Sequence, residues 1–354
     1  MRQSRKLDHL KYSLALDDGP AANGFADFSL VHNCLPGLAF SAIDLTTAVA
    51  GIPMRHPVII NAITGGAADV TAVNAQLAEL AKRTGAAMAV GSQYAALENP
   101  AVSESYQIVR SVNPDGVLFA NLGAHATPDQ AVRAVSMIGA DAIQIHLNTA
   151  QELAMPEGDR DFSGYLENIA AIAAASPVPV IVKEVGSGVA GEQAEALAAA
   201  GIRAIDTGGA GGTNFVAIEA ARGSAELPAD TLAWGIPTAV CAVEVASVLP
   251  PAVDLVVSGG IRSPLDAVKA LAVGGCSVAI ATPAIRLLRE KSLADAVAWF
   301  DAFLTEMRRY MLLVGARNIP ALAKVPVVIT GKSREWLDAR GIDTTRFARK
   351  GGRR

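Results

Sequence analysis

Short apolar runs alternate with alanine-rich stretches along most of this chain. Eight of these runs have the length and composition of buried strands. They are Val58–Asn61, Ala87–Gly91, Val117–Asn121, Ala142–His146, Val180–Glu184, Ala204–Asp206, Leu255–Ser258 and Val278–Ala281. Because the runs are apolar throughout instead of alternating with polar residues, they predict parallel strands that are covered on both faces.

The stretches between these strands have helical composition. They are Val70–Arg83, Pro128–Ile138, Gly164–Ala175, Gly191–Ala200 and Pro264–Val273. Thr127-Pro128 and Ser263-Pro264 each place a capping hydroxyl before a proline at the first helical position. Eight such units over about 225 residues favour an α/β fold, a (β/α)8 TIM barrel of the phosphate-binding type. A doubly wound open sheet is the alternative.

The barrel pattern divides the chain into three parts. We expect an N-terminal arm at residues 1–57 that contributes to the substrate site, and the barrel with its cofactor site at residues 58–315. Residues 316–354 are expected to form a C-terminal extension that ends in a solvated basic tail. Within the barrel, Leu287–Leu313 is predicted to be one closing helix.

Glycine and polar residues follow five of the predicted strands, at the end where barrels of this kind carry their chemistry. The clusters are Thr64-Gly65-Gly66, Gly91-Ser92-Gln93, Asn121-Leu122-Gly123, Lys183-Glu184-Val185-Gly186 and Ser258-Gly259-Gly260. Two connections, Leu147–Phe162 and Thr207–Asp254, are longer than a plain unit needs. Long loops on this face of a barrel are usually functional.

Composition narrows the possible partners. The formal net charge of −4 gives no general attraction to nucleic acid or to an anionic membrane, so an anionic ligand needs a local site. No apolar leader follows Met1, and no run reaches the roughly 18 apolar residues of a membrane helix, which predicts a cytoplasmic protein. The scattered Cys34, Cys241 and Cys276 are expected to be buried free thiols.

The loops after the seventh and eighth strands predict a phosphate site. They read Ser258-Gly259-Gly260-Ile261-Arg262 and Ala281-Thr282-Pro283, and the loop Gly208–Thr213 after the sixth strand adds glycines and a hydroxyl. Glycines let backbone N–H groups approach phosphate oxygens, and Arg262 can add charge. The basic cluster Arg5-Lys6-Leu7-Asp8-His9 would match further negative charge, such as that of a diphosphate.

Polar residues at the ends of two strands are candidates for chemistry. Lys183 closes a buried strand, where it must either extend to water or meet a negative group. Gln144, His146 and Asn148 share one face of the fourth strand at a period of two, which predicts that they point into the barrel. Glu152, in the loop that follows, could hold Mg²⁺ jointly with substrate phosphates, or could be a capping carboxylate.

These motifs, in this order, resemble the type II isopentenyl diphosphate isomerases along nearly the whole chain. The segments that carry the resemblance are Arg5-Lys6-x-x-His9, Asn61–Gly66, Val90–Gln93, Gln144–Asn148, Gln151–Arg160, Val182–Gly186 and Gly211–Thr213. The run from Gln144 to Arg160 is the most specific, because other FMN barrels lack that combination.

The resemblance implies residues for each ligand. For FMN it implies Ala62, Ile63, Thr64, Ser92, Asn121, Lys183, Thr213, Gly259, Gly260, Ala281 and Thr282. For the substrate it implies Arg5, Lys6, Ser92, Gln93, Tyr94 and Gln151, with Mg²⁺ on Glu152. Tyr94 and Thr282 depart from the residues that such enzymes usually carry. Members of the family resemble one another in forming homotetramers or homo-octamers.

The implied reaction is a 1,3-proton shift between isopentenyl diphosphate and dimethylallyl diphosphate in isoprenoid biosynthesis. Reduced FMN would serve as acid and base, and NADPH would only reduce the flavin. Lys183 would stabilise the reduced ring, while Gln151 and His146 would orient the alkene or move protons. The alternatives are a 2-hydroxy acid oxidase, a nucleotide dehydrogenase and a flavin-binding protein without activity.

Overall fold

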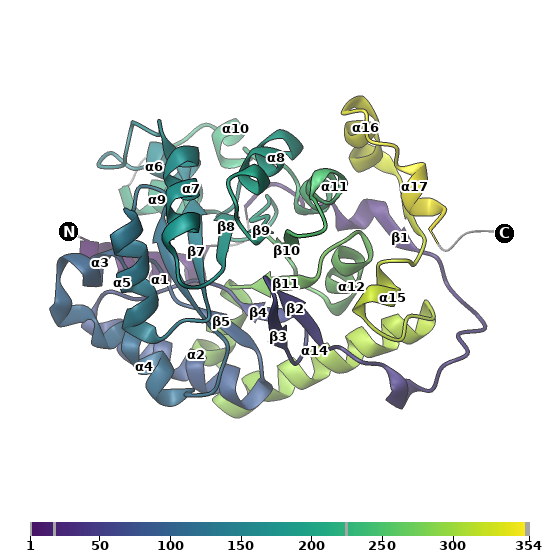
Figure 1. The fold of residues 1–354 in the computed structure, drawn as a ribbon, viewed down its shortest axis with the longest axis horizontal. Helices are drawn as coiled ribbons and strands as arrows, with labels where there is room; N and C mark the ends of the chain where they lie inside the picture. Colours follow the sequence, from purple (N-terminus) through teal and green to yellow (C-terminus); the bar gives the residue numbers. More distant parts are fainter. Residues whose placement is uncertain (1, 17–18, 224–225, 351–354) are drawn as a thin grey trace.

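The computed structural model describes residues 2–16, 19–223 and 226–350, with the side chains of residues 2–7 and 10 outside the description. Eight parallel strands close into a barrel in the order β10-β11-β4-β5-β6-β7-β8-β9 (Figure 1). They are β4 (Val58–Ile60), β5 (Ala87–Ala89), β6 (Leu118–Gly123), β7 (Ala142–Leu147), β8 (Val180–Glu184), β9 (Ala204–Asp206), β10 (Asp254–Ser258) and β11 (Ser277–Ile280). The predicted barrel is confirmed, and because β11 pairs with β4 the open sheet is excluded.

Helices surround the barrel and extend it at both ends of the chain. The α-helices are α1 (Arg2–Ala15), α2 (Thr71–Thr84), α3 (Tyr94–Glu98), α4 (Glu104–Val112), α5 (Pro128–Ile138), α6 (Thr149–Ala154), α7 (Tyr165–Ala175), α8 (Gly191–Ala199), α9 (Phe215–Gly223), α10 (Ala229–Leu232), α11 (Thr238–Val248), α12 (Pro264–Ala272), α13 (Thr282–Glu290), α14 (Leu293–Leu313), α15 (Ile319–Leu322), α16 (Gly331–Ala339) and α17 (Thr345–Ala348). Four short 3-10 helices are η1 (Phe25–Asp27), η2 (Phe40–Ala42), η3 (Ala68–Val70) and η4 (Pro100–Val102).

Two apolar cores hold this arrangement. Inside the barrel, side chains such as Ile59, Phe119 and Ile181 pack against one another and are almost completely buried. A larger core fills the space between the strands and the surrounding helices. Both faces of the strands are therefore covered, as the uninterrupted apolar runs predicted.

Capping residues at the helix starts confirm two predicted helices and correct a third. Thr127 and Ser263 cap α5 and α12, each in a capping box with a proline in the first turn. The single helix predicted at Leu287–Leu313 is wrong, because α13 ends at Glu290 and α14 begins at Leu293. Ser292 caps α14 in a third capping box, which starts a new helix at that point.

The arm and the C-terminal extension are joined by an antiparallel pair of strands. β1 (Phe28–Leu30) pairs with β12 (Val327–Ile329), so segments from the two ends of the chain lie side by side (Figure 1). A hairpin of β2 (Thr47–Val49) and β3 (Ile52–Met54) packs its buried side chains against the inner core. Near the C-terminus, the Lys350 ammonium donates to the Ala272 carbonyl at 2.9 Å. The predicted solvated tail is therefore wrong at Lys350, and residues 351–354 lie outside the description.

The predicted burial of all three thiols is wrong for Cys34, which is exposed, whereas Cys241 is buried and Cys276 is partly buried. Burial raises the pKa of the Cys241 and Cys276 thiols, which makes them poor nucleophiles. Among the helices of the described ranges, none combines the length and the apolar character needed to cross a bilayer.

Candidate active site

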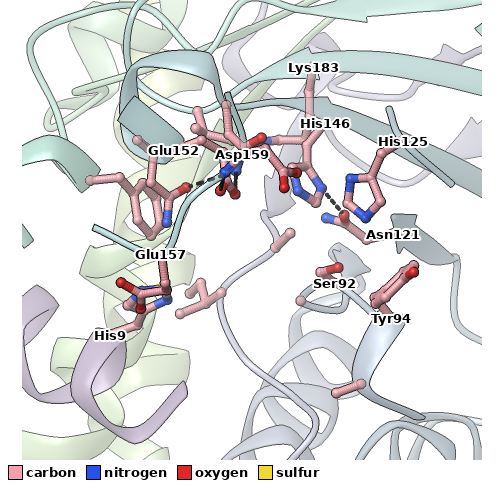
Figure 2. A pocket seen from close by; sticks show the side chains of 18 of the residues that line it. His9, Ser92, Tyr94, Asn121, His125, His146, Glu152, Glu157, Asp159 and Lys183 are labelled. Carbon is pink, nitrogen blue, oxygen red and sulfur yellow. Dashed lines mark hydrogen bonds between the residues drawn. The ribbon is translucent and has the colours of Figure 1, made fainter. Parts of the chain in front are cut away.

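A cavity of about 600 Å³ opens at the carboxyl ends of the barrel strands (Figure 2). Its wall includes nine of the residues singled out from the sequence: Ala62, Ile63, Ser92, Tyr94, Asn121, His146, Gln151, Glu152 and Lys183. His9 from α1 also reaches the cavity, so the N-terminal arm forms part of its wall. The structure thus brings together residues that are far apart in the sequence.

A smaller hollow of about 60 Å³ adjoins this cavity and shares Lys183, Ala62 and Phe215 with it. Its wall contains the remaining predicted phosphate residues, which are Thr213, Gly259, Gly260, Arg262 and Ala281. Thr282 starts α13 beside it, and its hydroxyl contacts the hydroxyl of Thr213 at 2.5 Å. Most of the predicted cofactor residues therefore line one of two adjoining spaces, whereas Thr282 lies beside the smaller one and Thr64 lines neither.

At the wall of the small hollow, the backbones of two neighbouring loops pack directly against each other. A Cβ added at Gly260 would lie 2.0 Å from the Gly211 carbonyl oxygen, and one added at Gly259 would lie 2.1 Å from that of Gly209. Both Gly259 and Gly260 also have positive φ angles, of 109° and 70°. Only glycine satisfies both conditions, so these positions let the loops after β9 and β10 pack closely against each other at the wall of the hollow.

The donors around this hollow fit an anionic cofactor. Helix α13 begins at Thr282, but Pro283 has no N–H and the Ala284 N–H donates to the Ala281 carbonyl at 3.1 Å, so the donors at this edge of the hollow are the hydroxyls of Thr282 and Thr213. Within the described residues, the buried hydroxyl of Thr64 has no hydrogen-bond partner in the protein, next to Ile63 on the cavity wall. A buried polar atom of this kind is usually satisfied by a bound group. These features fit the phosphate and ring of FMN.

Lys183 sits at the junction of the two spaces. It is 6% exposed, and its ammonium donates to the Glu184 carbonyl oxygen at 3.0 Å. Burial lowers the pKa of Lys183, and the nearby carboxylates of Asp206 and Glu184 oppose that shift. Because the ammonium is expensive to bury, a negative ligand in the cavity would gain strongly from it.

The polar face of the fourth strand points into the barrel, as predicted. The Nδ1 atom of His146 lies 2.7 Å from the Asn121 amide oxygen (Figure 2), while Gln144 is 2% exposed and Asn148 lines the cavity. Tyr94 lines the same cavity, with its ring against that of His125 at a centroid distance of 4.9 Å. An aromatic pair thus occupies the place where the resemblance suggested a contact to phosphate.

Glu152 faces the cavity from α6, and each of its carboxylate oxygens accepts a hydrogen bond. Asn148 Nδ2 donates to one at 2.8 Å and the Asp159 backbone N–H donates to the other at 3.0 Å. Three further carboxylates, of Glu157, Asp159 and Asp161, line the same cavity. In the part of the chain that is described, no three metal-binding side chains converge, so a cation here would need ligands from the substrate or water.

The structure does not bring Gln93 into the cavity. Its side chain is fully buried, and its amide donates to the Ala134 carbonyl and accepts from the Asn121 backbone N–H, at 2.9 and 3.0 Å. The glutamine follows the strand-end pattern, but it points toward α5 and supports the wall from behind. Arg5 and Lys6 lie on α1, and their side chains are outside the described residues.

Glu219 is a site residue that the sequence pattern did not reveal. It lies on α9 with its carboxylate fully buried, and it accepts hydrogen bonds from His9 Nε2, Gln151 Nε2 and Arg222 Nε at 2.7, 2.8 and 2.7 Å. Burial raises the pKa of this carboxyl group, but the three donors outweigh it and lower the pKa to about 2. A single glutamate in an alanine-rich helix carries no signal of partners from α1 and α6.

Comparisons with known proteins agree with this geometry. The model of the FMN-dependent dehydrogenase family matches residues 122–328. Three relatives named isopentenyl-diphosphate delta-isomerase match along the chain. The one from Symbiobacterium thermophilum is 49% identical over 100% of this chain and 99% of its own. The one from Geobacillus sp. is 46% identical over 97% and 98%, and the one from Moorella thermoacetica is 46% identical over 96% and 97%.

Solved structures of the same barrel are more distant in sequence. A putative lactate oxidase from Pediococcus acidilactici is 17% identical, with a TM-score of 0.68 over 93% of this chain and 94% of that one. A mandelate oxidase bound to (S)-mandelic acid is 17% identical, with a TM-score of 0.65 over 92% and 94%. These two share the fold, whereas the full-length relatives decide the family. The chain therefore belongs to the type II, FMN-dependent isopentenyl-diphosphate delta-isomerases.

Proposed function

We propose that this protein interconverts isopentenyl diphosphate and dimethylallyl diphosphate by a 1,3-proton shift with reduced FMN. The observation that carries the proposal is that two adjoining spaces share Lys183 in their walls. One is a small hollow lined by glycine-rich loops, suited to a phosphate, and the other is a large cavity with polar residues from α6 and β7. A flavin phosphate fits the first space, and a flavin ring with a five-carbon diphosphate fits the second.

The cofactor would be held by residues of the small hollow and the adjoining wall. Thr213, Thr282, Gly259, Gly260 and Arg262 surround the phosphate end, and residues from the ends of β4, β5 and β6 border the ring. When bound, reduced FMN supplies acid–base chemistry at an alkene carbon, which ordinary side chains protonate poorly. Lys183 provides the positive charge that favours an anionic ring, since its ammonium is buried where the field of a charge is strong.

The diphosphate would be bound at the mouth of the cavity. Arg5 and Lys6 are proposed to neutralise part of its charge, with Ser92 and Tyr94 on the facing wall. Mg²⁺ would neutralise more, held by Glu152 together with phosphate oxygens and water. The neighbouring carboxylates support a role for a cation here, because they would repel a bare diphosphate.

Gln151 and His146 would face the hydrocarbon part of the substrate. The Gln151 amide is anchored by its donor end to Glu219 at 2.8 Å, which fixes its direction. An amide is a poor acid, so Gln151 orients a partner instead of delivering the proton. His146 can carry a proton, because a ring nitrogen can gain or lose one near neutral pH.

Anaerobic turnover of isopentenyl diphosphate tests the proposal. Product should form with FMN, NADPH and Mg²⁺ together, and should vanish when reduced flavin or the metal is omitted. Lys183→Ala should lose most of the turnover. Lys269→Ala is the matched control, because this half-buried lysine donates to the Phe25 carbonyl at 2.8 Å, away from the cavity. Flavin binding without isomerisation, or oxidation of a 2-hydroxy acid, would overturn the proposal.

Three finer properties belong to the same proposal. NADPH would act only by reducing the flavin, because the isomerisation involves no net redox change. The protein would act in the cytoplasm and as a homotetramer or homo-octamer, in line with the resemblance. The oligomeric state is testable by light scattering of the FMN-loaded protein.

A further inference from the structure

A chain of buried polar side chains crosses the interior of the barrel and ends at His146. Its members are Ser258, Asp206, Asn61, Gln144 and Asn121, which are between 1% and 6% exposed. In the same order, they come from β10, β9, the end of β4, β7 and β6. The hydrogen bonds that join β9 to β4 and β4 to β7 therefore connect strands that are not neighbours in the barrel. Buried polar groups cost free energy unless they are satisfied, so the order of donors and acceptors along this chain is constrained.

Asp206 determines which way the side-chain amides in this hydrogen-bonded series are oriented. A carboxylate only accepts, and Asp206 accepts from the Ser258 hydroxyl and from Asn61 Nδ2, the latter at 2.7 Å. The Asn61 amide oxygen must then face the other way. It accepts from the Ala62 backbone N–H at 2.9 Å, which is a second and independent reason for this orientation.

Each following amide inherits its orientation from the one before. Gln144 Nε2 donates to the Asn61 amide oxygen at 3.0 Å, so the Gln144 oxygen faces Asn121. Asn121 Nδ2 donates to that oxygen at 3.4 Å, the longest link of the chain. The Asn121 amide oxygen therefore faces His146 Nδ1 at 2.7 Å, and an oxygen there requires a hydrogen on Nδ1.

We propose that Asp206 and Asn61, acting through Gln144 and Asn121, are positioning residues that hold neutral His146 with its proton on Nδ1. Neutral imidazole carries one hydrogen, so the Nε2 atom is then an acceptor. His146 lines the large cavity, and it therefore acts there as a proton acceptor and not as a fixed donor. To donate to a phosphate oxygen it must first take up a proton. The catalytic meaning of this inference rests on the proposed function, but the tautomer itself does not.

Nuclear magnetic resonance of protein labelled with ¹⁵N-histidine tests the tautomer directly. The chain has five histidines, and the His146 signal is assigned by its loss in His146→Asn. In neutral wild-type His146 the proton should be on Nδ1. Gln144→Met removes the central link and should shift the tautomer ratio roughly fivefold or more toward Nε2–H, as the loss of one hydrogen bond implies.

Gln93→Met is the matched control. Gln93 is an equally buried glutamine that bonds the backbone N–H of Asn121 without touching its side-chain amide, so its loss should leave the His146 tautomer unchanged. A proton on Nε2 in the wild type would overturn the inference, as would a folded Gln144→Met variant with an unchanged ratio. If Gln144→Met fails to fold, the wild-type spectrum alone decides. The tautomer is measured without substrate, so its result does not depend on the reaction. If His146 carries its proton on Nδ1 but the protein shows no isomerase activity, the proposed function is refuted and the inference about the tautomer stands.

Discussion

Replacing Glu219 by glutamine tests how much the charge of this buried carboxylate stabilises the fold. One amide oxygen can still accept from His9 and Gln151, but the new NH₂ group faces Arg222 Nε, donor against donor. Arg222 keeps its contact with Glu157, so it is not left without a partner. The change therefore removes one charge-assisted hydrogen bond and introduces one repulsive contact.

The expected loss of stability is about 2 to 3 kcal/mol. A hydrogen bond to a charged group contributes roughly 1.5–3 kcal/mol. An independent figure comes from the pKa of Glu219, which falls from the ordinary value of 4.5 to about 2 in the folded protein. That difference corresponds to about 3 kcal/mol for the interactions with His9, Gln151 and Arg222 together, so it sets an upper bound on the loss of one of them.

Urea unfolding of the two proteins measures this loss. Glu79→Gln is the control, because Glu79 makes a helix-surface pair with Arg83 whose loss should cost less than 1 kcal/mol. The pKa of Glu219 is lowered in the fold, so its stabilisation is fully present above about pH 4.5 and is lost as the pH falls toward about 2. The advantage of the wild type over Glu219→Gln should shrink over that range. A glutamine variant within 0.5 kcal/mol of the wild type at pH 7 would refute the reasoning.

Three further changes probe the cofactor and metal sites. Thr282→Ala should weaken FMN binding roughly tenfold and leave riboflavin binding unchanged, because riboflavin lacks the phosphate that the hydroxyl is expected to contact; fluorescence quenching measures both. Gly260→Ala should lower FMN affinity further and reduce the melting temperature, since its Cβ would lie 2.0 Å from the Gly211 carbonyl; an unchanged melting temperature would contradict the argument. Chelation should abolish turnover, with Mg²⁺ restoring it in the wild type but only poorly in Glu152→Gln; equal recovery would remove Glu152 from the metal site.

The barrel was predictable because its strands obey local rules. β8 at Val180–Glu184 and β9 at Ala204–Asp206 have the predicted bounds, since uninterrupted apolar runs followed by polar or glycine residues mark buried parallel strands. The starts of α5 and α12 were predictable for the same reason, because a capping hydroxyl followed by proline acts within one turn. The break between α13 and α14 was visible too, in Ser292 and Asp295, but the hydrophobic periodicity of the flanking helices masked it.

The parts of the site that were missed depend on contacts between distant segments. Glu219 meets His9 and Gln151 only because α1 and α6 are folded against α9. Gln93 follows a strand like its neighbour Ser92, and which of the two faces the cavity is decided by the direction of the chain in that turn. The pairing of β1 with β12 is equally beyond local reasoning, since two three-residue strands carry almost no periodic signal.

The β1–β12 pair has a consequence for how the protein is made. During synthesis, residues 28–30 leave the ribosome long before residues 327–329, so β1 must wait for almost the whole barrel before its partner strand exists. The β1 segment of the arm is therefore completed late, whereas the partner of His9, Glu219, is made much earlier. A chain that stopped short of residue 327 would leave the backbone groups of β1 without their partner strand, while the contact of His9 with Glu219 would remain.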